Sequence, residues 1–325
     1  MHSAAAVPSL PPVLCLGEVL EDCITKDHQR HCYLGGAPAN VAAGLVKLGT
    51  PAGFIGAVGQ DAIGDRLVEQ LEDLGVNLAG LQRVNQAPTR QVVVRHQANG
   101  DREFIGFAPV DCPCFADEQL QASQLPTSLI ESARFLVMGT LGFAAPMTSR
   151  ALTQALELAQ NNQIKVLIDI NWRPIFWTDP ELAKSTIRPL LSQAQVIKLA
   201  AEEADWLFQT TDPEAIKNQV QGNTGLVVIT DGERGCQFST GTISGELPAF
   251  GVQVVDTTGA GDGFVAGLLH CLCPVQDLHN ALTNPTFLTQ SLQFASAVGA
   301  MVTQGAGATT PQPTASEVQR FLDCP

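Results

Sequence analysis

Short apolar runs alternate with longer helical stretches along most of the chain. Runs of roughly four to eight apolar residues are typical of buried strands, and longer apolar or amphipathic segments are typical of helices. The predicted strands are residues 13–19, 52–58, 135–138, 166–170, 196–199 and 226–230. The predicted helices are residues 40–48, 63–74, 147–160 and 180–191. This alternation predicts an α/β fold with a doubly wound, mostly parallel sheet flanked by helices.

One early region departs from this alternation. Residues 91–96 and 102–107 are two β-rich runs that flank Asn99 and Gly100. Because Asn-Gly between two such runs is the strongest short hairpin signal, we expect a hairpin here that lies outside the alternating core.

A glycine-rich turn late in the chain predicts an anion site. Residues 256–262 (DTTGAGD) follow an apolar run, residues 247–255, which predicts a strand, and precede residues 263–273, which predict a buried helix. The first N–H groups of a helix lack intrahelical partners and its dipole is positive there, so a phosphate is stabilised. Asp262 then serves either as an ordinary helix cap or as a base beside the anion.

The sequence does not match two common nucleotide-binding motifs, the dinucleotide fingerprint and the Walker loop. Residues 261–266 satisfy the loose G-x-G-x-x-A pattern, but residues 280–287 hold no acid where a dinucleotide fingerprint needs one. The chain contains no Gly-Lys-Ser or Gly-Lys-Thr, which excludes a Walker loop. A second glycine turn, residues 35–40 (GGAPAN), enters a helix with Pro38 in its first turn.

Composition and charge narrow the class of protein. The 325 residues are 45% hydrophobic, which is enough for one large α/β domain, residues 13–325, after a disordered leader, residues 1–12. The net charge of −14 argues against nucleic acid or an anionic membrane as partner, because both need clustered Lys and Arg. An anionic small ligand must therefore be held locally, by backbone N–H groups, a few side chains and Mg²⁺.

The cysteines predict a reduced compartment. There are nine, an odd number without a paired framework, and the first dozen residues lack the basic and apolar parts of a signal peptide. We therefore expect a cytoplasmic protein. Candidate metal ligands lack the spacing of structural zinc sites and are interpreted as incidental thiols and loop residues: Cys112, Cys114, Cys271, Cys273, Cys23, Cys32, His28 and His31.

From about Val13 to about Pro313 the chain resembles the PfkB, or ribokinase-like, carbohydrate kinases, and the fructokinases most. The resemblance rests on residues 35–42 (GGAPANVA), residues 56–64 (GAVGQDAIG) and residues 256–262 together. It implies a ribokinase-like fold with a small β lid, formed by about residues 20–34 and 90–110. It also implies ATP-dependent phosphorylation of a primary hydroxyl of a sugar, D-fructose above others, with Mg²⁺.

The resemblance also implies roles for individual residues. Asp262 takes the proton from the sugar hydroxyl, while the amides of Gly259, Ala260 and Gly261 hold the phosphoryl group. The implied sugar-binding residues are Asp22, Gly35, Gly36, Asn40, Arg102, Phe107, Asn171 and Arg173. The implied nucleotide-binding residues are Lys198, Glu203, Thr230, Gly232, Gly235 and Ala297.

Several of these residues have an ordinary structural alternative. Asp256 and Thr258 lie where related kinases place a monovalent-cation loop, suited to K⁺, and their structural alternative is ordinary turn hydrogen bonding. Asn40 is also interpretable as a helix-turn cap, Asp22 as a surface acid and Arg173 as half of a loop ion pair.

The chain departs from the family pattern at two places. Ala200 and Ala201 stand where the family usually carries Asn or Ser, which puts metal handling there in doubt. Residues 89–91 (TRQ) put a cation and an amide beside the lid, where relatives have small or apolar residues.

Other functions stay open. One is a different sugar kinase of the same fold, a 2-keto-3-deoxygluconate kinase or a ribokinase. Another is a catalytically silent sugar-binding regulatory protein. A lid with exposed strand edges also suggests a homodimer.

Overall fold

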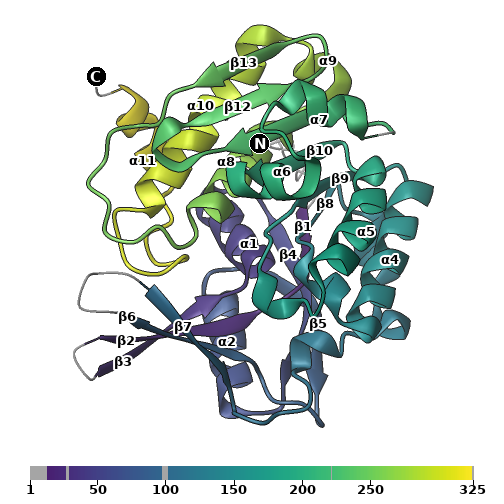
Figure 1. The fold of residues 1–325 in the computed structure, drawn as a ribbon, viewed down its shortest axis with the longest axis vertical. Coiled ribbons are helices and arrows are strands. Elements are labelled where there is room, and N and C mark those ends of the chain that lie inside the picture. The colour runs from purple at the N-terminus through teal and green to yellow at the C-terminus, as the bar shows by residue number, and fades with distance from the viewer. Residues whose placement is uncertain (1–12, 27–28, 97–101, 221, 324–325) are drawn as a thin grey trace, which may run out of the picture.

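Figure 1 shows the computed structural model, which describes residues 13–26, 29–96, 102–220 and 222–323. Its main sheet has nine strands in the order β13-β12-β11-β10-β9-β8-β1-β4-β5. Seven run parallel: β1 (Val13–Leu16), β4 (Ala52–Gly59), β5 (Asn77–Val84), β8 (Phe135–Met138), β9 (Lys165–Asp169), β10 (Val196–Ala200) and β11 (Leu226–Thr230). Two antiparallel strands, β12 (Cys236–Ser239) and β13 (Ser244–Leu247), extend one edge.

Helices cover both faces of this sheet. One core cluster packs alternate strand residues such as Val13 and Cys15 against α1 (Ala37–Lys47), α2 (Ala62–Asp73), α8 (Ala260–Leu272), α9 (Leu278–Leu282), α10 (Pro285–Val302) and α11 (Ala315–Asp323). The other packs Leu14 and Leu16 against α3 (Thr127–Glu131), α4 (Pro146–Asn161), α5 (Pro180–Leu190), α6 (Ala201–Phe208) and α7 (Pro213–Gln219). Strands buried on both faces explain the continuous apolar runs. The predicted doubly wound, mostly parallel fold is confirmed.

A second sheet projects from the main body (Figure 1). It has four strands in the order β3-β2-β6-β7: β2 (Leu20–Lys26), β3 (Gln29–Gly35), β6 (Gln91–His96) and β7 (Arg102–Ala108). We call this sheet the lid. Its β6–β7 pair is the predicted hairpin, whose turn, with Asn99 and Gly100, lies outside the described residues. The leader of residues 1–12 lies outside them as well.

The strand predicted over residues 247–255 is wrong. The sheet edge ends with β13 at Leu247, and the following segment is irregular up to the start of α8. Val254 and Val255 are 55% and 63% exposed, so this apolar run packs against no partner strand. The anion turn is therefore a loop-to-helix turn, held where Val255 N and Asp256 N both donate to Thr303 O.

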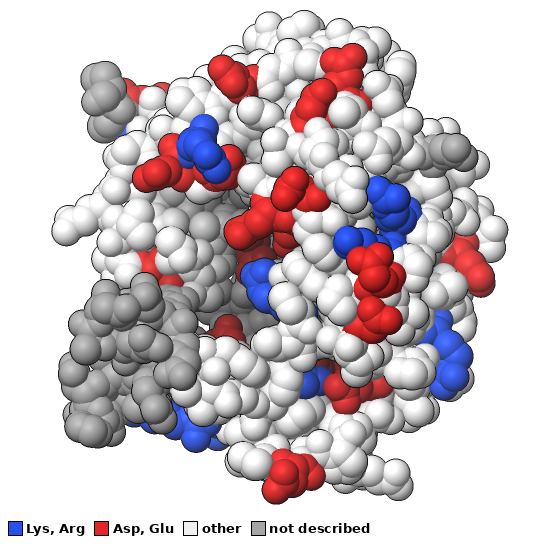
Figure 2. Space-filling view, viewed as in Figure 1, with Lys and Arg blue, Asp and Glu red and all other residues white. Residues whose placement is uncertain are grey.

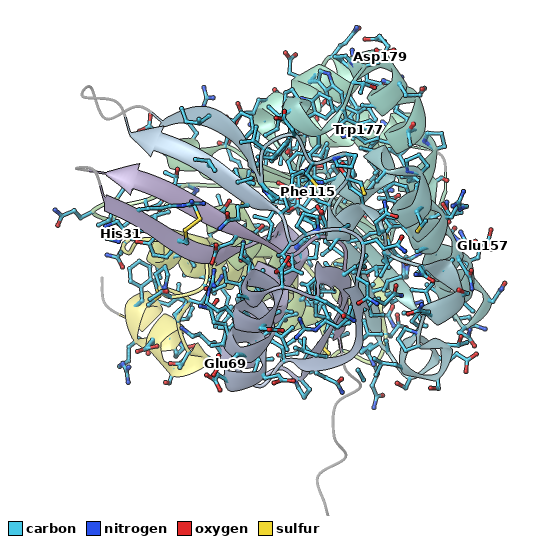
Figure 3. The ribbon with its side chains drawn as sticks, turned by 90° about the horizontal axis from the view of Figure 1, so that it is seen from below. His31, Glu69, Phe115, Glu157, Trp177 and Asp179 are labelled. Carbon is cyan, nitrogen blue, oxygen red and sulfur yellow. A yellow bond between two sulfur atoms is a disulfide. The ribbon has the colours of Figure 1, made fainter. Side chains whose placement is uncertain are left out.

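The cysteine interpretation also needs correction. Cys23 and Cys32 form a disulfide, because antiparallel pairing of β2 with β3 sets them opposite each other with Cα atoms 4.1 Å apart. Figure 3 shows this bond between strands of the lid. At least one pair of cysteines is therefore cross-linked, and the inference of a reduced compartment loses the support of unpaired cysteines. Cys112, Cys114 and Cys271 carry free thiols, as expected.

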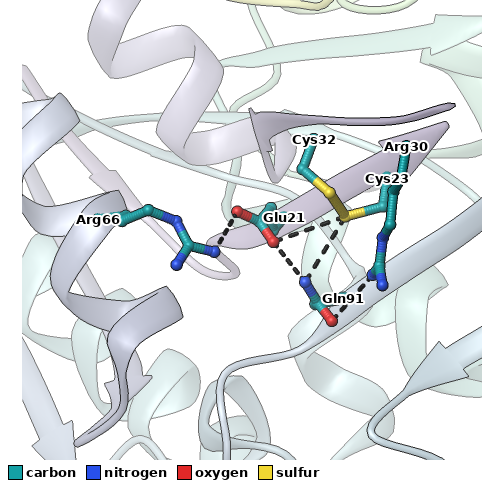
Figure 4. The surroundings of a disulfide bond; sticks show 6 residues. All are labelled: Glu21, Cys23, Arg30, Cys32, Arg66 and Gln91. Carbon is teal, nitrogen blue, oxygen red and sulfur yellow. Dashed lines mark hydrogen bonds and ion pairs between the residues drawn. A yellow bond between two sulfur atoms is a disulfide. The ribbon is translucent and has the colours of Figure 1, made fainter.

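The surroundings of the disulfide tie the lid to the main body (Figure 4). Glu21 Oε1 accepts a hydrogen bond from Arg66 Nη2 of α2 at 2.9 Å, and Glu21 Oε2 accepts one from Gln91 Nε2. Arg30 Nη2 donates to Gln91 Oε1 at 3.0 Å. The amide at residue 91 therefore joins three strands of the lid.

No helix within the described ranges is long and apolar enough to cross a lipid bilayer.

Candidate active site

The turn into α8 has the geometry of an anion site. Gly259 is the N-cap, with φ of 79°, and no side chain caps this helix end. A Cβ on Gly259 would lie 2.5 Å from Ala308 Cβ, so only glycine fits here. Of the three predicted amides, Ala260 N already makes a long hydrogen bond of 3.3 Å to Thr257 O. The helix terminus thus presents N–H groups and a positive dipole end at one point.

Asp262 is not a helix cap. Its Oδ2 accepts a hydrogen bond of 2.8 Å from Asn40 Nδ2, which lies 222 positions away on α1. Burial raises the pKa of Asp262 to about 6, and the nearby Asp169 adds to this, while Asn40, Lys198 and Arg173 oppose it. A carboxylate with such a pKa is suited to accept a proton near neutral pH.

The second glycine turn brings polar groups to the same place. A Cβ on Gly35 would collide with Asp22 Oδ2, so this carboxylate faces the turn directly. Gly36, with φ of 98°, is the N-cap of α1, which excludes Asn40 as the cap. Asn40 Oδ1 is buried and has no hydrogen-bond partner among the described residues. It is therefore available to a ligand hydroxyl.

Lys198 supplies a buried positive charge beside the anion turn. Its Nζ lies 3.1 Å from Asp169 Oδ1, and a Cβ on Gly261 would lie 2.9 Å from this Nζ. Burial disfavours the charge, but the carboxylates of Asp169 and Glu203 outweigh it and raise the pKa of Lys198. The ammonium thus stays charged where a phosphoryl group would meet the helix terminus.

Glu203 positions backbone rather than facing the turn. Its Oε2 accepts from Ala200 N and its Oε1 from Trp172 N, both at 2.7 Å. These bonds hold the start of α6 and the loop after β9 together. The neighbouring Asn171 has a left-handed φ of 44°, and Arg173 is exposed, with its Nη1 donating to Trp172 O at 2.8 Å.

The remaining nucleotide-side residues lie on separate elements. Thr230 ends β11, and Gly232 and Gly235 shape the next turn, with φ of 51° and 90°. Ala297 is fully buried in α10, where it belongs to the core rather than to an open surface. A contact between Ala297 and a nucleotide stays a prediction.

Asp256 joins two loops. Its Oδ1 accepts from Thr258 N at 2.8 Å, and its Oδ2 accepts from Gly307 N at 3.2 Å. The turn hydrogen bonding expected as the alternative to a cation site is therefore present. Gly307 also contacts the lid, because a Cβ there would lie 2.8 Å from Tyr33 Cδ1.

Two residues of the lid, Phe107 and Arg102, are predicted to bind the sugar, and the structure describes the side chain of Phe107 alone. Phe107 makes edge-to-face contacts with Phe115 and Phe176, with ring centroids 5.9 and 5.1 Å apart. The side chain of Arg102 lies outside the described residues. Figure 2 shows that one face of the molecule is hollowed near its centre, and that acidic and basic side chains gather in the hollow.

Two polar residues of this region, Asp169 and Asp117, are not among those predicted from the sequence. The sequence does hold a signal for Asp169, because this residue ends a core strand at the edge where α/β proteins bind ligands. Asp117 had no such signal: it is buried in a short 3₁₀ helix, Ala116–Glu118, and pairs with Arg90, 27 residues away.

Comparisons with known proteins give the following similarities. A family model described as pfkB family carbohydrate kinase matches residues 12–315. "Probable fructokinase-4" of Arabidopsis thaliana is 34% identical over 290 residues, which cover 89% of this chain and 87% of that protein. A crystal structure of fructokinase with bound ATP from Xylella fastidiosa matches with a TM-score of 0.89 and 31% identity, covering 96% of this chain and 98% of that one. A fructokinase double mutant from Vibrio cholerae O395, in a form with fructose, ADP and potassium ion bound, matches with a TM-score of 0.84 and 28% identity, covering 97% and 99%.

Proposed function

The chain belongs to the PfkB family of carbohydrate kinases, and from that premise we propose that it transfers the γ-phosphoryl group of ATP to a primary hydroxyl of D-fructose. The main support for the proposal is that the first turn of α8 lies against α1, although the two segments are far apart in the sequence. Asp262, in the first turn of α8, is hydrogen bonded to Asn40 on α1, beside the turn that faces Asp22. A base, an anion site and sugar-binding groups thus share one place.

The geometry supports the following reaction. Asp262 takes the proton of the acceptor hydroxyl, and that oxygen attacks the γ-phosphorus in line with the bond to the leaving ADP. The N–H groups of Gly259, Ala260 and Gly261, with the Lys198 ammonium, stabilise the negative charge on the transferring phosphoryl oxygens. Positioning and electrostatic stabilisation account for most of the rate enhancement in such transfers.

We extend the proposal to two metal ions. Glu203 has both oxygens engaged by backbone N–H groups, so it fits Mg²⁺ through its water shell better than as a direct ligand. Asp169 Oδ2 accepts a hydrogen bond from Lys198 Nζ at 3.3 Å, whereas Asp169 Oδ1 makes no hydrogen bond among the described residues and is available to one of those waters. Mg²⁺ bound with ATP neutralises phosphate charge. For K⁺ we propose the loop of Asp256 and Thr258, supported by the potassium-bound fructokinase.

The lid supports two further parts of the proposal. It excludes water from the acceptor hydroxyl, with Phe107 and Arg102 near the opening. Phe104 and Ile105 of β7 expose 39% and 45% of their surface, and Val110, just after this strand, exposes 79%. These apolar side chains support a homodimer formed through the lid. Cytoplasmic localisation and the absence of nucleic acid and membrane partners stay predictions.

A coupled ADP-release assay tests the proposed function. We expect turnover on fructose to exceed that on other ketoses, on aldoses and on sugar acids. Negligible turnover on fructose, with high turnover on ribose or 2-keto-3-deoxygluconate, would favour the other family kinases. Sugar binding by calorimetry without ADP release on any sugar would favour a silent regulatory protein.

Gly35→Ala is expected to raise KM for the sugar by roughly tenfold or more, the scale of one lost hydrogen bond to a charged group. The added Cβ collides with Asp22 Oδ2 and displaces that carboxylate. The measurement is steady-state kinetics with sugar and ATP varied separately. KM for ATP should change little. Gly251→Ala is the matched control, because nothing lies within 4 Å of its added Cβ. An unchanged sugar KM in Gly35→Ala would remove Asp22 from sugar binding.

A further inference from the structure

A small cavity of about 40 Å³ lies at the base of the lid, next to the residues that precede β2 and β6. Its polar wall consists of Glu18, Arg90, Asp117 and Glu118, and its apolar wall includes Leu141 and Phe176. The volume exceeds the roughly 10–15 Å³ that one water needs. It fits a hydroxyl or hydroxymethyl group and is too small for a whole sugar.

The charges on the Arg90 side of the cavity are already paired. Arg90 Nε lies 2.9 Å from Asp117 Oδ2, and Arg90 Nη2 lies 2.6 Å from Glu118 Oε1. The guanidinium also lies over the rings of Phe107, Phe115 and Phe176, at 4.7, 4.2 and 4.9 Å.

Hydrogen bonds to Asp61 fix the position of Thr89, the residue before Arg90. Thr89 N and Thr89 Oγ1 donate to the two oxygens of Asp61, at 2.7 and 2.9 Å. This wall is therefore a fixed surface whose positive charge is balanced by two carboxylates.

Glu18 is the polar group of the cavity that lacks a full set of partners. Its Oε1 accepts a hydrogen bond of 3.2 Å from Ala37 N, and only 4% of the residue is exposed. Its Oε2 is buried and has no hydrogen-bond partner among the described residues. A buried polar atom without a partner costs free energy, so a ligand atom at this position is favoured.

Glu18 and Asp262 flank the same helix terminus. Glu18 accepts from the first residue of α1, and Asp262 accepts from Asn40, one turn further along that helix. Asp262 does not line the cavity. It is nevertheless close enough to Glu18 to affect the pKa of that residue, so a sugar whose reacting hydroxyl contacts Asp262 can place a group at its other end in the cavity.

We propose that Glu18 is a sugar-binding residue whose Oε2 forms a hydrogen bond with a hydroxyl of the acceptor remote from the phosphorylated one. This inference rests on the proposed function. It also defines the substrate class, because a cavity whose one cation is neutralised by two carboxylates disfavours the carboxylate of a sugar acid. The occupant is a neutral hydroxyl group.

The protonation state of Glu18 sets the direction of this hydrogen bond. Burial raises the pKa of Glu18 to about 8, and Asp117 and Asp262 add to the shift, while backbone N–H groups oppose it. Arg90 and Glu118 are the other charged groups that line the cavity. At pH 7 the carboxyl is therefore neutral and donates its proton to a sugar oxygen. Above pH 8 the ionised group has lost the proton that it donates to the sugar oxygen, so we expect sugar affinity to fall.

Two substitutions test this role. In Glu18→Gln the side-chain oxygen still accepts from Ala37 N and the amide still donates into the cavity, so KM for fructose should stay within about threefold of wild type at pH 7. Glu18→Ala removes the donor and should raise this KM about tenfold or more, with KM for ATP little changed. The wild-type sugar KM should rise above pH 8, and that of the Gln variant should not.

The outcomes separate this inference from the proposed function. Unchanged fructose KM in Glu18→Ala, with a water then filling the cavity, would overturn the role of Glu18 and leave the kinase assignment intact. If Glu18→Ala does not fold, identical pH profiles of wild type and Glu18→Gln would overturn it as well. If no sugar is phosphorylated, calorimetric affinities of the same proteins for fructose decide the binding role independently of catalysis.

Discussion

Asp262→Asn is expected to lower kcat by about 10²-fold or more and to leave KM for the sugar close to its wild-type value. The substitution keeps the size of the side chain and an oxygen that accepts from Asn40 Nδ2. It removes the proton acceptor, and general-base catalysis is worth roughly 10²–10⁴-fold. A loss in kcat without a loss of sugar affinity indicates an interaction made in the transition state. Steady-state kinetics with both substrates varied measure the two quantities.

The pH profile gives a second measurement of the same role. Because the pKa of Asp262 is raised to about 6, wild-type kcat/KM should fall about tenfold per pH unit as the pH drops below that value. The residual activity of Asp262→Asn should lack this decline. Asp65→Asn is the matched control, since Asp65 pairs with Arg83 on the surface of α2 and is 71% exposed. If Asp262→Asn kept more than a tenth of wild-type turnover, the role of Asp262 as the base would be contradicted.

Lys198→Met is expected to lower kcat/KM by about 10²-fold, the scale of losing one group that stabilises transition-state charge. Methionine has a similar length and no charge, and the lost ammonium is the one directly beside Gly261. The same substitution leaves Asp169 without its buried partner, which costs roughly 3–5 kcal/mol of stability. Kinetics and thermal unfolding must therefore be measured together.

A double variant separates these two effects. Asp169→Asn combined with Lys198→Met removes both buried charges, so much of the lost stability should return. Turnover should stay low, because the positive charge at the anion turn is still missing. If the double variant regained wild-type turnover, Lys198 would act only as the counter-ion of Asp169.

Most of the fold was readable from the sequence for a simple reason. Parallel strands buried on both faces appear as continuous apolar runs, and the intervening helices carry their own start and stop signals. The same logic failed at residues 247–255, where an apolar run lies exposed on an irregular segment. The edge strands β12 and β13 were also missed, because each is four residues long and β13 is mostly exposed.

The candidate site likewise has a part that the sequence predicts and a part that it does not. The two glycine turns were found because glycine and a helix start are local signals. The contacts between distant residues were not, because they depend on how the sheet brings segments together. Asn40 and Asp262 are 222 positions apart, and the Cys23–Cys32 disulfide depends on the register of β2 with β3. The buried cluster of Arg90 and Asp117 left no local pattern at all.

Gly307 has a consequence for how sequence variation should be read in this protein. It has no side chain and no chemical role, but the ring of Tyr33 fills the space beside it, its amide is bonded to Asp256, and its φ of 77° is one that other residues rarely adopt. Inactivating substitutions in a random mutant library should therefore accumulate at this position as readily as at the reacting groups. A search for functional groups would overlook Gly307, because this position matters only through the lack of space for a side chain among its neighbours.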